Sequence, residues 1–174
     1  MVIVRDASRE DVAAICAFGR EHVPPHYEPL IGRAAAQAQV ERWWGSDHVS
    51  AATTDGRVVV AEDAGQVVGV GQRGPDHVVY KLYVHPGHRG TGLGPRLIEA
   101  LERQLPPGVG RLSIEHFAAN QGAARFYERE GFAVDRVEPS PTGVPGLAVV
   151  WRSRPVGRIT DRPRPQAEEP RGGR

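Results

Sequence analysis

The stretch HPGHRGTGLGPRL, residues 85–97, places three glycines at alternate positions directly before a segment with helical spacing. Glycine destabilises a helix, so Gly90, Gly92 and Gly94 at a helix start need a physical reason. Proline is tolerated only in the first helical turn, so Pro95 prevents the helix from beginning much before Gly92. A glycine turn that leads into a helix exposes free N–H groups at the positive end of the helix dipole. The stretch therefore predicts an anion site, best suited to phosphate.

The segments on either side of this turn predict a β-α-β unit. Residues 77–84 and 111–117 have the composition of strands, and residues 94–105 have helical spacing. Strands connected in this way are parallel, with a right-handed crossover. The glycine turn then lies at the carboxyl end of the first strand, where α/β proteins bind ligands.

The other segments extend this unit to one α/β domain, which we predict to span residues 1–154. We expect further strands at 2–5, 57–63, 66–72, 132–138 and 145–153, with a two-residue hairpin turn at 64–65. We expect helices after Ser8, at 33–44 and at 121–131, and a loop around Pro24, Pro25 and Pro29. Residues 155–174 contain almost no apolar side chains, so we expect a disordered tail there.

Composition excludes several classes of protein. The 174-residue chain has a net charge of +1, which gives no electrostatic case for binding nucleic acid. No apolar run approaches the roughly 20 residues that span a bilayer, and the first residues become polar too soon for a signal peptide. Cys16 is the single cysteine, which rules out an internal disulfide or a thiolate metal cluster. We expect a cytoplasmic protein that binds neither nucleic acid nor membrane.

Two common phosphate motifs do not fit the glycine turn. A Walker A loop would need a Gly-Lys-Ser/Thr sequence, which does not follow. The dinucleotide fingerprint, started at Gly90, would place its third glycine at Pro95. That fingerprint also follows its strand directly, whereas HPGHR intervenes here. A nicotinamide dinucleotide site is therefore disfavoured.

A third motif agrees with the turn and with a second segment. LYVHPGHRGTGLG resembles the acetyl-coenzyme A signature of the GCN5-related N-acetyltransferase (GNAT) family, with Arg89, Gly92 and Gly94 at its core positions. NQGAARFYEREGF, residues 120–132, resembles the family's Asn-x-x-Ala-x-x-Phe-Tyr-x-x-x-Gly-Phe segment. The matching residues there are Asn120, Ala123, Phe126, Tyr127, Gly131 and Phe132. The order of elements also fits from residue 2 to about residue 153.

This resemblance implies a fold and a co-substrate. The fold is a single-domain mixed sheet of six to seven strands with about four helices, in which strands 77–84 and 111–117 splay apart to form a cleft for acetyl-CoA. The main chain of strand 77–84 pairs with the pantetheine arm, and the amides of the turn hold the pyrophosphate. The implied contacts are Leu82, Tyr83, Val84, Arg89, Gly90, Thr91, Gly92, Leu93 and Gly94. The Arg89 side chain either bonds a phosphate or is solvated.

The resemblance also implies acetyl transfer to a primary amine by direct attack on the thioester, with no metal. Tyr127 occupies the position of the acid that protonates the leaving thiolate, and this position also contacts the cofactor. Alternatively, Tyr127 is only an aromatic packing residue beside Phe126. Asn120 either bonds the pantetheine arm or caps the following helix. Many relatives carry a glutamate early in the first splayed strand, where this chain has Val78, so Glu115 is the best candidate for the base. Weaker candidates are Glu62, His77 and Glu28.

The sequence indicates little about the identity of the acceptor substrate. In the family it meets two loops that correspond to residues 21–33 and 137–146. The first offers His22, His26, Tyr27 and Glu28, with Trp43 and Trp44 nearby, which would suit a small cationic amine; alternatively the tryptophans belong to the core or to an interface. A small-molecule amine is favoured over a protein or peptide amine, and a homodimer is one option. The alternative function is a non-catalytic acetyl-CoA-binding sensor domain.

Overall fold

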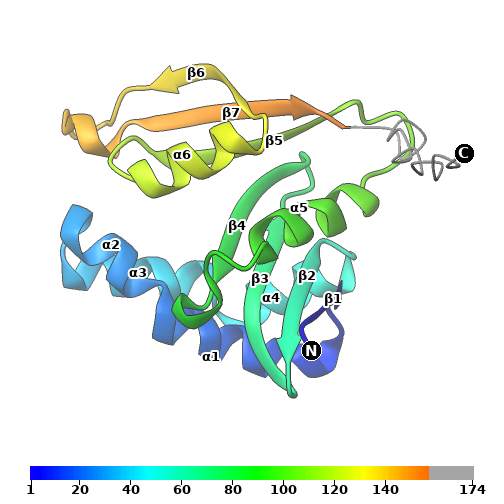
Figure 1. Ribbon diagram of the computed structural model, residues 1–174. Coiled ribbons are helices and arrows are strands. Elements are labelled where there is room, and N and C mark those ends of the chain that lie inside the picture. The colour runs from blue at the N-terminus through cyan, green and yellow to red at the C-terminus, as the bar shows by residue number, and fades with distance from the viewer. Residues whose placement is uncertain (157–174) are drawn as a thin grey trace, which may run out of the picture.

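A computed structural model of the chain describes residues 1–156. Seven strands form one open sheet in the order β1-β2-β3-β4-β5-β7-β6 (Figure 1). The strands are β1 (Ile3–Asp6), β2 (Val58–Asp63), β3 (Gln66–Arg73), β4 (Val78–Val84), β5 (Arg111–Phe117), β6 (Ala133–Glu138) and β7 (Val149–Pro155). Among the strands of residues 1–156, only β4 and β5 are parallel neighbours, as the predicted β-α-β unit requires. The mixed α/β fold is thus confirmed.

Six α-helices and three short 3-10 helices lie within the described residues. The α-helices are α1 (Val12–His22), α2 (Pro24–Ile31), α3 (Arg33–Trp43), α4 (Ser46–Thr54), α5 (Leu93–Arg103) and α6 (Gln121–Arg129). The 3-10 helices are η1 (Arg9–Asp11), η2 (Pro86–His88) and η3 (Pro145–Leu147). No helix in residues 1–156 is both long enough and apolar enough to cross a bilayer.

The sheet carries one apolar core on each face. Alternation along β2 explains the division, because Val58 and Val60 pack toward α1–α4 whereas Val59 and Ala61 pack toward α5. The core beneath α5 continues under α6 and includes Tyr127, Phe132 and residues of β5. Both faces are therefore covered around β2 and β3, whereas every residue of β6 is exposed.

The two parallel strands separate soon after they meet. Two residue pairs join them, Val78 with Ser113 and Val79 with Ile114, and β4 then curves away from β5 (Figure 1). On its other edge β4 pairs with β3 through a register shift, so that Lys81 faces Gln72 but Val79 faces Arg73. This bulge leaves Tyr80 as the extra residue and bends β4 at the point where the two strands part.

The helices differ in part from expectation. The proline-rich segment predicted to be a loop forms α2, because Pro24 and Pro25 occupy its first turn, where a missing N–H costs no hydrogen bond. The sequence analysis assigned no helix to residues 46–54, which form α4. These two helices raise the number from about four to six. The hairpin turn is confirmed at Ala64 and Gly65, which both have positive φ.

The C-terminal strand ends at Pro155, one residue beyond the predicted domain boundary. The Val156 N–H also donates to the Gly110 carbonyl at 3.0 Å. The remainder of the predicted tail, residues 157–174, lies outside the described residues.

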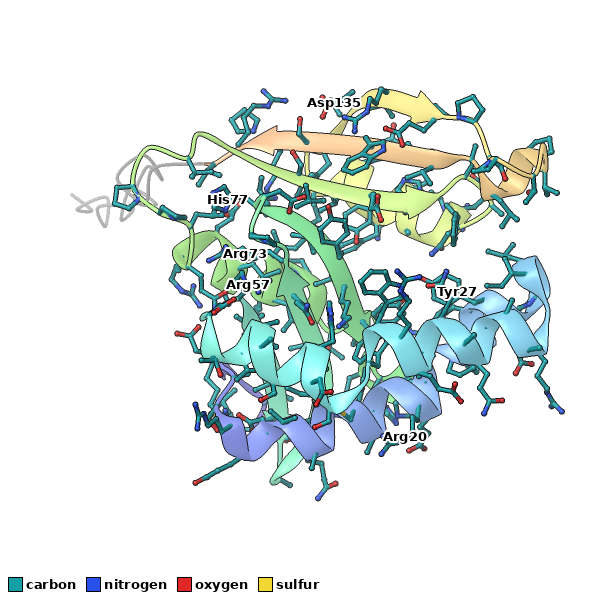
Figure 2. All side chains as sticks on the ribbon, turned by 180° about the vertical axis from the view of Figure 1, so that it is seen from behind. Arg20, Tyr27, Arg57, Arg73, His77 and Asp135 are labelled. Carbon is teal, nitrogen blue, oxygen red and sulfur yellow. The ribbon has the colours of Figure 1, made fainter. Side chains whose placement is uncertain are left out.

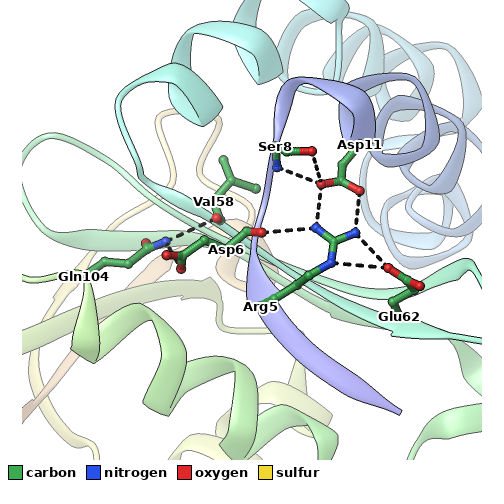
Figure 3. A network of polar contacts seen from close by, with 7 residues as sticks. All are labelled: Arg5, Asp6, Ser8, Asp11, Val58, Glu62 and Gln104. Carbon is green, nitrogen blue, oxygen red and sulfur yellow. Dashed lines mark hydrogen bonds and ion pairs between the residues drawn. The ribbon is translucent and has the colours of Figure 1, made fainter. Parts of the chain in front are cut away.

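A polar network ties the first strand to the first helix (Figure 3). The Arg5 guanidinium donates to both carboxylate oxygens of Asp11, at 2.7 and 2.8 Å, and to Glu62 at 2.7 Å. Asp11 also accepts from the Ser8 N–H at 2.7 Å, which holds the start of the helical segment. Hydrogen bonding to Arg5 lowers the pKa of Asp11 to about 2. Glu62 is thus engaged on β2, which β3 separates from the splayed strand β4.

Candidate active site

The glycine turn has the geometry of an anion-binding loop. Gly90 and Gly92 have φ of +77° and +78°, and no atom lies within 4 Å of where either Cβ would be. Gly92 is the N-cap of α5, so the free amides of its first turn face the space that these glycines leave open. Gly94 has a different role, because its Cβ would lie 2.8 Å from Cζ of Phe126. It allows α5 to pack closely against α6.

This turn lines a cavity of about 570 Å³ that occupies the gap between β4 and β5. Its walls come from α2, β4, the glycine turn with the start of α5, the end of β5 and α6. The predicted site residues that line it are Leu82, Tyr83, Val84, Arg89, Gly90, Gly92, Leu93, Gly94, Glu115, Asn120 and Tyr127. Thr91 does not line it; its hydroxyl donates to the His88 carbonyl at 2.7 Å and holds the turn.

The main chain of β4 offers hydrogen-bonding groups to this cavity at alternate residues. The His85 N–H donates to Val68 on β3 at 2.9 Å, and Val84 lies opposite Gly69. In an antiparallel ladder, hydrogen-bonded and non-bonded residue pairs alternate along the strand. The main-chain N–H and C=O of Tyr83 therefore point toward β3, whereas those of Leu82 and Val84 point toward the gap between β4 and β5. The Tyr83 hydroxyl instead donates to that of Tyr27 at 2.9 Å, on the opposite face of the sheet.

Two polar side chains bracket the cavity. The Arg89 Nε donates to the Val84 carbonyl at 3.3 Å, and its Nη2 lies 3.0 Å from Nε2 of His26 on α2. At the other side Asn120 accepts from the Ala123 N–H at 3.1 Å and so caps α6. Asn120 also lines the cavity, so capping does not remove it from the site.

Tyr127 lies between the apolar core and the cavity. Its ring stacks on His116 at 5.9 Å and contacts Phe126 and Phe132 edge-on, at 5.1 and 5.6 Å. The side chain is 7% exposed, and within residues 1–156 its hydroxyl makes no hydrogen bond. Burial raises the pKa of this hydroxyl, which therefore stays protonated and able to donate. The geometry shows the aromatic packing of Tyr127 and places the residue in the cavity wall, so the acid role stays a prediction.

A second cavity, of about 590 Å³, lies on the face of the sheet that carries α1–α4. Trp43, Trp44, His48, Gln72 and Lys81 belong to its walls. The residues that line both cavities are Tyr27, Tyr80, Tyr83, Glu115, His116 and Phe117. Tyr27 reaches from α2 toward β5 on this face, and its ring lies 5.8 Å from that of Phe117 (Figure 2). The two cavities thus meet at the splay.

Residues 54–134 match the family model of the acetyltransferase (GNAT) domain. This part of the chain matches the GNAT acetyltransferases, and the described chain has their fold. Solved structures agree with its fold: the PaiA N-acetyltransferase from Thermoplasma acidophilum, in complex with coenzyme A, superposes with a TM-score of 0.73 at 14% identity, over 89% of this chain and 99% of that one.

Two further structures share the fold of this GNAT domain. A GCN5-related N-acetyltransferase from Rhodopseudomonas palustris has a TM-score of 0.70 at 21% identity, over 88% of this chain and 94% of that one. YncA, a putative acetyltransferase from Salmonella typhimurium with acetyl-CoA, has a TM-score of 0.61 at 22% identity, over 96% and 99%. A comparison with curated proteins found no significant match.

Glu115 is the carboxylate of the GNAT domain that stands at the junction of the two cavities. It lies opposite Trp151 on β7, and Ile114 beside it packs toward α5, so Glu115 faces the side of α1–α4. Burial raises its pKa, and the charges of Glu138 and Asp76 add to this effect. Within residues 1–156 no cation lies within ion-pair distance of it. A half-buried carboxylate with a raised pKa is suited to accept a proton.

The other candidates for the base are engaged elsewhere. His77 has a φ of 64° and its Nδ1 lies 3.4 Å from Nη1 of Arg73, at the start of β4 (Figure 2). Glu28 lies 3.7 Å from Nε of Arg33 on the helical surface. In the part of the chain that the structure describes, no group of three His, Cys, Asp or Glu side chains is placed to hold a metal ion.

The sequence analysis missed Tyr80 and Lys81. Tyr80 donates its hydroxyl to Asp76 at 2.6 Å and borders both cavities. Lys81 is the only lysine of the chain, which was a visible signal, but its burial depends on the face that the bulge gives it.

Proposed function

We propose that this GNAT domain transfers an acetyl group from acetyl-CoA, bound in the first cavity, to the amine of a small molecule bound in the second. The observation that carries the proposal is that the cavity with the glycine turn opens, through the splay of β4 and β5, onto a second cavity lined with aromatic and polar side chains. A shared gap is what a reaction between two separately bound substrates needs, because the reacting atoms must approach within about 3–3.5 Å.

Two parts of the chain bind acetyl-CoA, the glycine turn and strand β4. The amides of residues 90–94 face the pyrophosphate, where the positive φ of Gly90 and Gly92 keeps side chains away, whereas the Arg89 N–H donates to the Pro86 carbonyl at 3.3 Å. The main-chain groups of Leu82 and Val84 pair with the amides of the pantetheine arm. Asn120 and Tyr127 border its inner end. When bound, acetyl-CoA supplies a thioester whose carbonyl carbon accepts an amine.

Two side chains handle the protons of the reaction. Glu115 takes a proton from the acceptor amine, directly or through water, so that the nitrogen can form its bond to the carbonyl carbon. Of the two main-chain N–H groups of β4 that point toward the gap, at Leu82 and Val84, one stabilises the oxygen that gains negative charge and the other pairs with the pantetheine arm. Tyr127 donates its proton to the sulfur as the carbon–sulfur bond breaks. The products are an N-acetylated amine and coenzyme A.

The competing function is a non-catalytic acetyl-CoA-binding domain, which Val78 favours because the family commonly has a glutamate at that place. Equilibrium dialysis with labelled acetyl-CoA tests binding, and release of thiol in the presence of a panel of primary amines tests transfer. We expect both. Binding without amine-dependent thiol release would favour the sensor, and no binding would overturn both functions. A protein acceptor, a homodimer, a cytoplasmic location and a domain boundary at residue 154 stay predictions.

A further inference from the structure

The second cavity contains a buried ammonium group without a counter-ion. Lys81 is 5% exposed, and within residues 1–156 no carboxylate lies within ion-pair distance of its Nζ. Its partners are neutral: Nζ donates to the Trp43 carbonyl at 2.5 Å and to Oε1 of Gln72 at 2.6 Å, and it lies 4.8 Å from the centre of the Trp44 ring. An ammonium has three N–H donors, so one of them is left without an oxygen or nitrogen acceptor.

The neighbours of Lys81 hold it in a fixed position. Nε2 of Gln72 lies 3.1 Å from Nε2 of His48, which fixes the Gln72 amide with its oxygen toward Lys81. The Trp43 carbonyl belongs to the last residue of α3, where the helix dipole favours a cation. Burial nevertheless lowers the pKa of Lys81 to about 7, so these neutral groups compensate only part of its desolvation. An added anion would restore the charged form.

The other charges of the second cavity are already partnered, apart from Glu115. Arg57 donates to Asp55 at 2.6 Å, and Asp76 accepts from Tyr80 at 2.6 Å. Glu115 lines both cavities, whereas Lys81 lines only the second. The cavity is therefore bipolar, with an unpaired carboxylate at the gap and an unpaired ammonium on the side of α3 and α4.

We propose that the acceptor is a compound of the amino acid class, with its amine presented to Glu115 and its carboxylate bound by Lys81. This inference rests on the proposed function and narrows its substrate. A carboxylate is favoured over a phosphate because a single ammonium offers one charge and one free donor, whereas a phosphate dianion needs more of both. Trp44 belongs to the buried core, which was one of the two alternatives for the tryptophans, and together with Trp43 it forms the wall beside Lys81.

The test uses matched substrates and needs no variant at first. Amino acids with the amine and carboxylate one, two or three carbons apart are compared with their carboxamides and with the amines that lack the carboxylate. For at least one spacing we expect kcat/KM with the amino acid to exceed that with its carboxamide by about tenfold or more. Equal values at every spacing would overturn the inference while leaving the proposed function in place. Absence of transfer to any panel member would overturn the proposed function itself.

Two variants separate charge from packing. Lys81→Met keeps the apolar stem and should bring the ratio of amino acid to carboxamide close to one, mainly through KM for the amino acid, with the Kd of acetyl-CoA unchanged. Gln72→Leu removes one of the two oxygen acceptors of Lys81 and so favours its neutral form, and it should weaken the preference less than Lys81→Met does. Persistence of the full preference in Lys81→Met would overturn the role of Lys81. If Lys81→Met does not fold, the substrate comparison on the unmodified protein still decides.

Discussion

Tyr127→Phe removes a single hydroxyl from the site. That hydroxyl makes no hydrogen bond within residues 1–156, whereas the ring contacts His116, Phe126 and Phe132. Removing an unpartnered hydroxyl leaves the core intact, so the free energy of unfolding should change by less than about 0.5 kcal/mol. If the hydroxyl protonates the leaving thiolate, kcat should fall by about 10²-fold, which corresponds to about 2.7 kcal/mol of transition-state stabilisation.

The assay is steady-state thiol release with an accepted amine, run beside a titration with acetyl-CoA. We expect the Kd of acetyl-CoA to stay within about twofold, because the ring that borders the cavity is retained. Phe132→Leu is the matched control: it removes an aromatic contact of the Tyr127 ring without touching either cavity, so stability should fall by about 1 kcal/mol with little change in kcat. Normal turnover in Tyr127→Phe would refute the acid role and leave Tyr127 as a packing residue.

Three further predictions follow from charge and packing. Because burial raises the pKa of Glu115, kcat/KM should rise with pH above the range in which an ordinary glutamate titrates. Glu115→Gln should abolish this rise in the pH profile. A rise that persists in Glu115→Gln would assign the base to another residue. Because the pKa of Lys81 is lowered, the unfolded chain binds more protons than the folded chain between about pH 7 and 10. The free energy of unfolding of the unmodified protein, relative to that of Lys81→Met, should therefore rise over that range in denaturant titrations at several pH values. A difference between the two proteins that does not change with pH would contradict the lowered pKa. Gly94→Ala should lower the free energy of unfolding by about 1 kcal/mol in urea titrations, since its Cβ would meet Phe126; an increase would show that the ring moves aside freely.

The β-α-β unit and its glycine turn were predictable because their signals are local. The positive φ of Gly92, the position of Pro95 in the first turn of α5 and the two-residue turn at Ala64 and Gly65 all follow from neighbouring residues. Gly94 was misinterpreted in part, because the aromatic ring that requires its missing Cβ comes from α6.

The second cavity was not predictable from the sequence in this way. Its walls combine helices α2 to α4 with strands β3 to β5, and the loop between α1 and α3 was expected to be irregular. The face to which Lys81 points depends on the bulge at Tyr80, which a period-two pattern cannot reveal. The unpaired charges of Lys81 and Glu115 become visible only when the partners of every neighbouring charge are known.

The most direct test of the account is a calorimetric titration of acetyl-CoA into Gly92→Asp. Aspartate tolerates the positive φ of this position, but its carboxylate would stand where we place the pyrophosphate. Repulsion of about 2 kcal/mol should raise the Kd about thirtyfold or more. Gly56→Asp, at a φ of +64° with no atom within 4 Å, controls for backbone strain and added charge and should bind like the unmodified protein. An unchanged Kd in Gly92→Asp would contradict the placement of acetyl-CoA at the glycine turn.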